Sequence, residues 1–289
     1  MEDILRSIYQ EKASNPETLG ILGVEKSYFS KPLTDTFDVV LFIILTESNQ
    51  EIFIKHYKFD DKKAMMYIVT ESKLKEWIVL GNNWKAMEWI HNGKVLFDRN
   101  EYIKKLKTEL NDFPFHSRKI KMAIEFTKLI RRYMDGKSFF QNDQFIDAYN
   151  YIVHSLHHLA RLSIIENGFH PELMVWNQVK QIEPEIYKLY EELLTSEETI
   201  QKRLELLFLA SEFLISSKIE ECTNHLIEIM RKRDYWSIND LISHPEIKHY
   251  AIDLPILLEF LIEKQLVAIK KIETKGKGIF HRYYQINNS

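Results

Sequence analysis

The chain has 289 residues, of which 45% are hydrophobic and 28% charged, and its net charge at pH 7 is -3. These values are ordinary for a globular protein of two or three domains and exclude a global positive field that would draw it onto nucleic acid or membrane. The single cysteine, Cys222, excludes an intrachain disulfide and a cysteine-rich metal site, and it predicts a reducing, cytoplasmic setting.

The first segment, residues 1–114, mixes predicted helices and strands. Apolar runs bounded by polar residues or glycine predict strands at residues 19–23, 37–46, 51–58, 65–70 and 94–97. Periodic segments predict helices at residues 2–12, 73–80 and 84–90. Polar residues 47–50 predict a hairpin that joins the second strand to the third. The longest apolar run, residues 39–45, predicts a strand buried on both faces and is too short to span a membrane. The N-terminal residues lack the apolar core of a signal peptide, so we expect no membrane partner.

The second segment, residues 115–220, is predicted to be a helical bundle. Helices are expected at residues 118–134, 143–167, 171–182, 184–194 and 196–217. Asp135 and Gly136 predict the end of the first of these helices, and Gly168 the end of the second.

The third segment, residues 221–289, has the order helix, helix, helix and hairpin that is typical of a winged helix. The expected helices are 221–234, 239–243 and one that opens near Asp253, and the expected strands are 267–272 and 280–286.

The stretch from Gly23 to Asp38 carries a family resemblance. Gly23 ends one predicted strand and Asp38 opens the next. This resembles the signature of the nucleotidyltransferase superfamily with the DNA polymerase β-like fold, where Gly-Ser is followed by Asp-x-Asp. The serine position is Val24 here, and the first aspartate position is Thr36. Residues 93–99, GKVLFDR, are similar to the strand that often ends such a catalytic domain.

The whole chain resembles an uncharacterised nucleotidyltransferase-like family of Bacillus-type bacteria. The resemblance implies an α+β protein with a nucleotidyltransferase-like α/β domain over residues 1–114. A helical, substrate-domain-like bundle over residues 115–220 and a winged helix over residues 221–289 would follow.

The resemblance also implies a magnesium site. Enzymes of this superfamily hold two Mg²⁺ with three carboxylates on adjacent strands. Asp38 alone occupies a matching position, as catalytic residue and metal ligand. Acids at strand ends could complete the site, but nothing in the sequence selects one of them. A single carboxylate could still help to hold one Mg²⁺ already bound to phosphates; the alternative for Asp38 is a solvated acid at a strand end.

Gly23 and two residues that follow it, Ser27 and Lys31, are candidates for binding a nucleotide phosphate. Gly23 is expected to turn the chain into a helix N-terminus, whose N–H groups could receive phosphate. Ser27 and Lys31 could contact the same phosphate. A plain turn glycine followed by a solvated loop is the alternative interpretation.

His154, His158 and Arg161 are the candidate substrate-binding residues of the bundle. His154 and His158 are four residues apart on one helix, a spacing that can bind zinc, but no third ligand is evident. Histidines lining an interdomain cleft are the favoured interpretation. Arg161 could clamp a phosphate or carboxylate, or form an ordinary ion pair.

The winged helix predicts at most weak contact with nucleic acid. Its third helix carries Glu259 and Glu263 where a DNA-reading helix needs basic or amide side chains. Its predicted hairpin is basic, and the side chains that could meet a phosphate backbone are Lys270, Lys271, Lys275, Lys277 and Arg282. A solvated hairpin whose edge lysines block aggregation is at least as consistent with this pattern. If the hairpin binds no nucleic acid, a contact with protein is the remaining expectation.

Two functions remain open on the sequence. In the favoured one, the metal site is degenerate and the protein binds a nucleotide or a partner in the cleft between the first two domains. In the other, the chain is an active Mg²⁺-dependent nucleotidyltransferase that moves NMP from NTP to a hydroxyl acceptor.

Overall fold

The chain folds into two compact units in the computed structural model, one spanning residues 1–114 and the other residues 115–289. The structure describes residues 2–26, 33–80, 83–112, 115–172 and 174–287. The fold class is α+β: a mixed sheet with helices forms the first unit, and a helical bundle followed by a winged helix forms the second.

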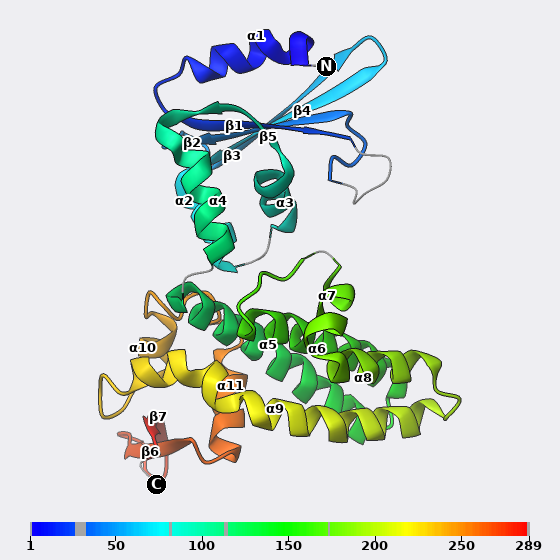
Figure 1. Ribbon diagram of the computed structural model, residues 1–289. Helices are drawn as coiled ribbons and strands as arrows, with labels where there is room; N and C mark the ends of the chain where they lie inside the picture. The colour runs from blue at the N-terminus through cyan, green and yellow to red at the C-terminus, as the bar shows by residue number, and fades with distance from the viewer. Residues whose placement is uncertain (1, 27–32, 81–82, 113–114, 173, 288–289) are drawn as a thin grey trace. The chain divides into compact units, whose positions relative to one another are not determined.

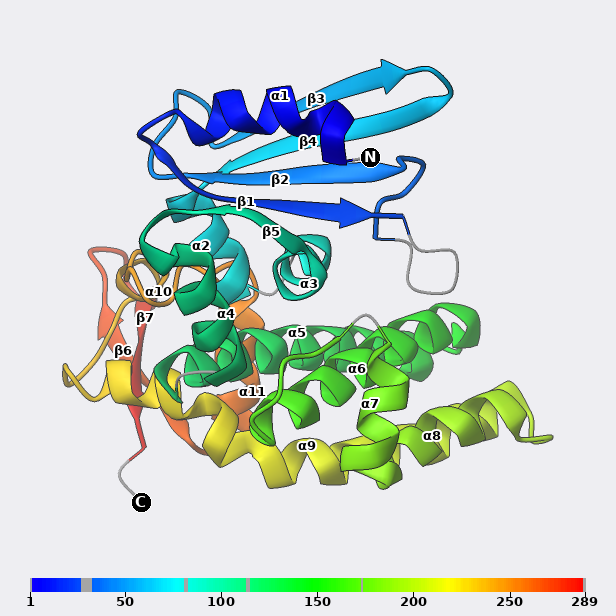
Figure 2. The same ribbon diagram turned by 45° about the horizontal axis from the view of Figure 1, so that its top comes forward.

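The first unit contains a sheet whose strand order is β3-β4-β2-β1-β5 in the described residues (Figure 2). Its elements are α1 (Glu2–Ala13), β1 (Thr18–Glu25), β2 (Val39–Leu45), β3 (Ile52–Phe59), β4 (Lys62–Thr70), α2 (Glu71–Leu80), α3 (Trp84–Asn92), β5 (Lys94–Asp98), η1 (Arg99–Glu101) and α4 (Tyr102–Asp112). The pair β2–β4 is parallel, and the other neighbouring strands are antiparallel. The predicted strands and helices of this segment are therefore confirmed, with ends that shift by a few residues.

The predicted hairpin between the second and third strands is wrong. Strand β3 forms its hairpin with β4, and β4 lies between β3 and β2. The physical reason is burial: every residue of β2 is buried, so β2 needs a neighbour on both sides, whereas β3 is largely exposed and lies at the edge.

Both faces of the sheet are covered, which makes the first unit a three-layer structure (Figure 1). Leu5 of α1 packs with Ile21, Leu41 and Ile43 on one face. On the other face, helices α2, α3 and α4 bury their apolar side chains against the alternate strand residues; these helix residues are Leu74, Trp77, Ala86, Trp89, Ile90, Ile103 and Leu106. The alternation of inward and outward residues along β1 and β2 assigns each strand side chain to one of these two cores.

The second unit begins with a bundle and ends with a winged helix. Its elements are α5 (Phe115–Gln141), α6 (Phe145–Glu166), α7 (Val175–Ile182), α8 (Pro184–Thr195), α9 (Ile200–Met230), α10 (Ile238–Ile242), α11 (Leu254–Glu263), β6 (Val267–Glu273) and β7 (Phe280–Ile286). Helix α6 packs alongside α5, and α9 packs against both.

Several helix boundaries differ from the sequence prediction. Asp135 and Gly136 do not end the first bundle helix, because α5 continues to Gln141. A β-carbon at Gly136 would lie 3.2 Å from Tyr151 Cβ, so this glycine serves the close approach of α5 and α6 rather than a helix stop. Helix α7 begins at Val175, four residues after the predicted start at Pro171. The predicted helices 196–217 and 221–234 are one helix, α9, and the expected division between residues 220 and 221 lies inside it.

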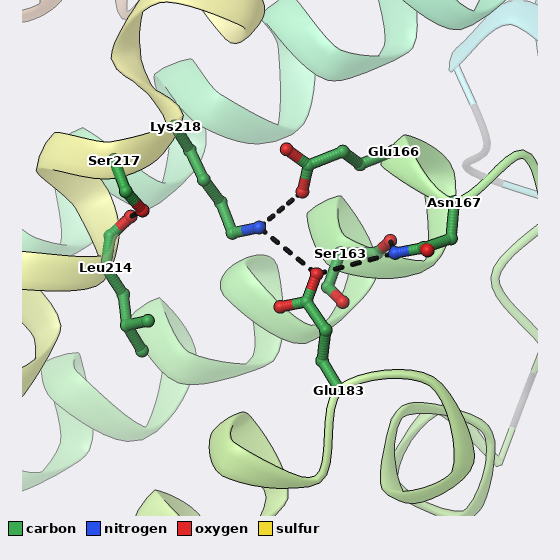
Figure 3. A network of polar contacts seen from close by, with 7 residues as sticks. All are labelled: Ser163, Glu166, Asn167, Glu183, Leu214, Ser217 and Lys218. Atoms are coloured by element: carbon green, nitrogen blue, oxygen red, sulfur yellow. Dashed lines mark hydrogen bonds and ion pairs between the residues drawn. The ribbon is translucent and has the colours of Figure 1, made fainter.

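A polar network joins three parts of the bundle (Figure 3). The Lys218 ammonium group on α9 donates to the carboxylate of Glu166 at the end of α6 and, over 3.3 Å, to that of Glu183 just before α8. Asn167 also donates to Glu183, over 3.4 Å. The Lys218 side chain is 9% exposed, so this buried cation is held by two acids from separate elements.

The winged helix packs directly on the bundle. Helix α10 starts with a capping box between Ser237 and Asp240. The Phe260 ring of α11 lies edge-on to Phe126 of α5, with ring centroids 6.3 Å apart. The hairpin β6–β7 is linked to the segment between α9 and α10 through a bridge between Trp236 and Tyr284. In the described part of the chain, no helix is both long and apolar enough to cross a membrane.

Candidate functional site

Asp38 immediately precedes β2, the middle strand of the sheet, as the sequence predicts. Its backbone N–H donates to the Lys63 carbonyl over 2.9 Å, and the Lys63 N–H donates to Asp38 Oδ2 over 2.8 Å. Lys26, just after β1, donates its N–H to the Asp38 carbonyl over 2.8 Å. The carboxylate is half-buried and is oriented by the neighbouring strand β4.

The acids around the strand ends do not supply a two-metal site with Asp38. Asp35 is exposed and accepts from Lys85 Nζ over 2.6 Å. Glu51 and Glu71 form ion pairs with lysines of α2, at 3.4 and 2.8 Å. No group of three or more His, Cys, Asp or Glu residues that could hold a metal ion occurs within the described residues. The donor set therefore does not fit the three-carboxylate, two-magnesium arrangement that the family resemblance implies.

Gly23 does not turn the chain into a helix. It lies inside β1, where it pairs with Leu41 of β2 on one side and with Lys94 of β5 on the other. The strand continues to Glu25, so the predicted strand end at Gly23 is wrong. Antiparallel pairing on both sides holds this part of β1 in the sheet. Ser27 and Lys31, the other two predicted phosphate contacts, lie outside the described residues.

His158 and Arg161 of α6 meet at a carboxylate that the sequence did not single out. His158 Nδ1 lies 2.8 Å from Glu125 Oε2, and Arg161 Nε donates to Glu125 Oε1 over 3.1 Å. Glu125 comes from the middle of α5 and its side chain is 4% exposed. Burial alone would raise the pKa of this carboxyl, but the hydrogen bond from His158 and the charge of Arg161 outweigh it and lower the pKa to about 2. Glu125 therefore accepts from the histidine ring and fixes Nδ1 as its protonated nitrogen.

Burial lowers the pKa of two neighbouring basic groups, His157 and Lys121. Burial, assisted by the charge of Arg161, lowers the pKa of His157 to about 4. The same two causes lower the pKa of the Lys121 ammonium group to about 8, against the opposing charge of Glu125. His154, the remaining predicted substrate residue, is exposed. Among the residues that the structure describes, His154 and His158 belong to no cluster of three or more potential metal ligands, and Arg161 forms an ion pair with Glu125.

A cavity of about 480 Å³ opens beside this cluster. Its lining residues are Lys128, Arg131, Arg132, Asp135, His158 and Asp253. Four of them come from consecutive turns of α5, one from α6 and one from the residue that precedes α11. A cavity of this size fits a small-molecule ligand, and its three cations, against the two carboxylates of Asp135 and Asp253, favour an anionic one.

The sequence prediction missed Glu125 and the three cations that line the cavity, Lys128, Arg131 and Arg132. Lys121, Glu125, Lys128 and Arg132 repeat at intervals of four, three and four residues, which puts them on one face of a helix. That periodic charge was present in the sequence and could have been read as a polar stripe inside a buried helix.

Comparison with known proteins places this fold in a class. The family described as Nucleotidyltransferase-like matches residues 1–118. The family described as YgxA-like substrate binding domain matches residues 119–218, and a Helix-turn-helix domain matches residues 224–286. The mixed sheet with Asp38 at the start of its middle strand is thus a nucleotidyltransferase-like domain, followed by a substrate-binding-domain-like bundle and a winged helix.

Whole-chain relatives give the same assignment. The chain is 51% identical to the uncharacterised protein YgxA of Bacillus subtilis (strain 168), over 98% of this chain and 97% of that protein. The crystal structure of a nucleotidyltransferase-like protein from Exiguobacterium sibiricum 255-15 matches with a TM-score of 0.86 and 40% identity, over 99% of both chains. The chain therefore belongs to the nucleotidyltransferase-like family that includes YgxA.

Proposed function

We propose that this protein is a nucleotidyltransferase-like protein with a degenerate metal site that binds a nucleotide. The observation that carries the proposal is the isolation of Asp38. The residue level with it on the parallel neighbour β4 is Lys63, a cation, and Asp35 is engaged by Lys85. A transfer reaction that needs two closely held Mg²⁺ has too few carboxylates among the described residues.

The bundle supports the binding half of the proposal. It matches a family described as a substrate binding domain, and it carries His158, Arg161 and the cation-lined cavity on α5 and α6. Arginine and lysine side chains pair with phosphate oxygens through charge-assisted hydrogen bonds. A nucleotide would bind to these cations through its phosphates.

Two assays on the full chain test the proposal. Isothermal titration calorimetry with ATP, GTP, CTP and UTP, with and without Mg²⁺, should detect binding of at least one nucleotide. Release of pyrophosphate from labelled NTPs should stay at background across small-molecule, RNA and protein acceptors. Robust release that disappears in Asp38→Ala would reverse the proposal and identify an active Mg²⁺-dependent nucleotidyltransferase. The absence of any nucleotide binding would remove the nucleotide as the ligand.

We also propose that the winged helix contacts nucleic acid weakly, through its hairpin rather than through α11. Phe260 of α11 packs on α5, and Glu259, on the exposed side of the same helix, is paired with Arg282 of β7 at 2.6 Å. The hairpin carries Lys270, Lys271, Lys275 and Lys277 on exposed positions. A protein partner on the same hairpin is the alternative outcome.

A further inference from the structure

The lining of the cavity on α5 contains an ion pair between α5 and the residue that precedes α11. Arg131 Nε donates to Asp253 Oδ1 over 2.9 Å, and both side chains are partly exposed, at 34% and 27%. Asp253 immediately precedes α11, yet its carboxylate caps no N–H group of that helix. The carboxylate is therefore committed to Arg131, and α11 does not depend on it as a cap.

The other two cations of the cavity have no carboxylate partner of their own. Within the described residues, neither Lys128 nor Arg132 forms an ion pair within 4 Å, and the Arg132 guanidinium lies 5.4 Å from the centre of the Tyr151 ring. The nearby acid Glu125 is already engaged by His158 and Arg161. The cavity thus holds three cations and two carboxylates, Asp135 and Asp253, and among these described residues only Asp253 forms an ion pair with one of the cations within 4 Å.

This is the arrangement of an anion-binding site in which the Asp253 carboxylate takes the place of the anion. Asp253 takes only one nitrogen of the Arg131 guanidinium, whereas a phosphate group could take two of them in parallel. Lys128 and Arg132, on the same stretch of α5, would supply charge to further phosphate oxygens. A ligand with several linked phosphates matches three cations better than a single carboxylate does.

The geometry points to a polyphosphate-binding site in the cavity lined by Lys128, Arg131, Arg132 and His158, in which Asp253 competes with the ligand for Arg131. This inference rests on the proposed function, because it assigns the phosphates of the nucleotide to this cavity. Since Asp253 leads into α11, ligand binding would also release the contact between Arg131 and the winged helix.

The test uses the full chain and measures the dissociation constants of ATP, ADP, AMP, adenosine and tripolyphosphate by calorimetry. Arg131→Gln and Lys128→Gln should each weaken ATP and tripolyphosphate binding roughly tenfold, the loss expected for one charged hydrogen bond. Asp253→Asn should strengthen both at least about fivefold, because it removes the competing negative charge and keeps the side-chain shape. Lys188→Gln, an exposed lysine of α8 in the same unit, is the matched control and should change nothing.

The variants separate this inference from the proposed function. If ATP binds the wild-type chain but with equal affinity in Arg131→Gln and Asp253→Asn, this cavity is not the phosphate site, while nucleotide binding survives. If tripolyphosphate binding changes in the variants as expected but no nucleotide binds, the polyphosphate site in the cavity is supported and the nucleotide proposal fails. If neither ligand binds, both are overturned. Tighter binding by Asp253→Asn cannot result from a damaged fold, and circular dichroism checks the folding of the weaker variants.

Discussion

Lys63 lies level with Asp38 across the parallel pair β2–β4, and its N–H group donates to the Asp38 carboxylate over 2.8 Å. A carboxylate that receives a backbone hydrogen bond orders the strand entry, whatever else it does. Asp38 therefore has a structural role at the start of β2 that needs no metal.

Asp38→Ala should lower the free energy of unfolding by about 1 to 2 kcal/mol, because the Lys63 N–H loses its acceptor in the folded state. Asp38→Asn keeps an oxygen acceptor and should lose less. Urea unfolding of the full chain measures both. Asp35→Ala is the matched control, since the exposed pair of Asp35 with Lys85 should contribute less than about 1 kcal/mol. Equal losses in Asp38→Ala and Asp35→Ala would show that the hydrogen bond to Lys63 is not stabilising.

The sheet shows what the sequence could and could not predict. Its inner strands are visible as apolar runs, because they bury their side chains. Their order is not visible: residues 47–50 have hairpin composition, yet β3 pairs with β4 and not with β2. Pairing depends on which strand must be covered on both sides, and that is a property of the whole layer. Likewise, Gly136 looks like a helix end in the sequence, but it lies inside α5, where it lets the helix approach Tyr151 of α6 closely.

Glu125 should stabilise the bundle at neutral pH and lose that contribution in acid. Its pKa is lowered from 4.5 to about 2 in the folded chain, so the stabilisation is complete above pH 4.5 and declines as the pH falls towards 2. In Glu125→Gln, stability should therefore fall less steeply as the pH drops. The urea midpoint, measured between pH 5 and pH 2.5, gives this acid limb of the stability profile. At pH 7, Glu125→Ala should cost about 3 kcal/mol, because it leaves Arg161 without its carboxylate.

The control for this prediction is Glu228→Gln. Glu228 pairs with Lys119 near the surface, also has a lowered pKa, and should change the acid limb much less. An acid limb that is as steep in Glu125→Gln as in the wild type would contradict the assignment of the acid sensitivity to Glu125.

His157 should make folding sensitive to pH in a higher window. Burial lowers its pKa from 6.5 to about 4, so the unfolded chain binds more protons than the folded chain between these values. Stability therefore falls as the pH drops from 6.5 to 4, since the buried ring must be kept neutral. His157→Gln, which cannot titrate, should remove this slope. Thermal melts at pH 7, 5.5 and 4.5 would show it, and His154→Gln, an exposed change on the same helix, should leave the slope as it is.

Lys218 should be worth more to stability than any surface lysine. Replacement by Met leaves the partly buried carboxylates of Glu166 and Glu183 without their shared cation, at a cost of about 3 kcal/mol. The double variant Lys218→Met with Glu166→Gln should recover part of this loss, because it removes one of the two unpaired charges. Urea unfolding of the single and double variants tests the coupling, and strict additivity of their effects would contradict it.

The candidate site was predictable only in part, for a reason of geometry. His158 and Arg161 stand out in the sequence because histidines and an arginine share one helix face. Their partner Glu125 is far away in the chain, and only the packing of α5 against α6 brings the three together. Asp253 is more distant still, since its contact with Arg131 depends on the docking of the winged helix. Local spacing identifies residues on one element, whereas a pocket is made by several.

The hairpin lysines should carry whatever contact the winged helix makes with nucleic acid. Lys271, Lys275 and Lys277 are exposed on β6 and the turn that follows it, whereas α11 is packed on α5 through Phe260. Each lysine that meets a phosphate releases about one counterion, so the triple change to Ala should reduce the salt slope of binding by up to about 3. Fluorescence anisotropy with short DNA and RNA duplexes from 20 to 200 mM salt measures this slope. Lys180, Lys188 and Lys202, exposed on the bundle helices, form the matched triple control and should leave the salt slope unchanged.

Tight, salt-insensitive binding to one defined sequence that persists in the triple variant of the hairpin would mean that another surface reads the nucleic acid. Absence of binding at the lowest salt would leave the hairpin as a protein-docking surface.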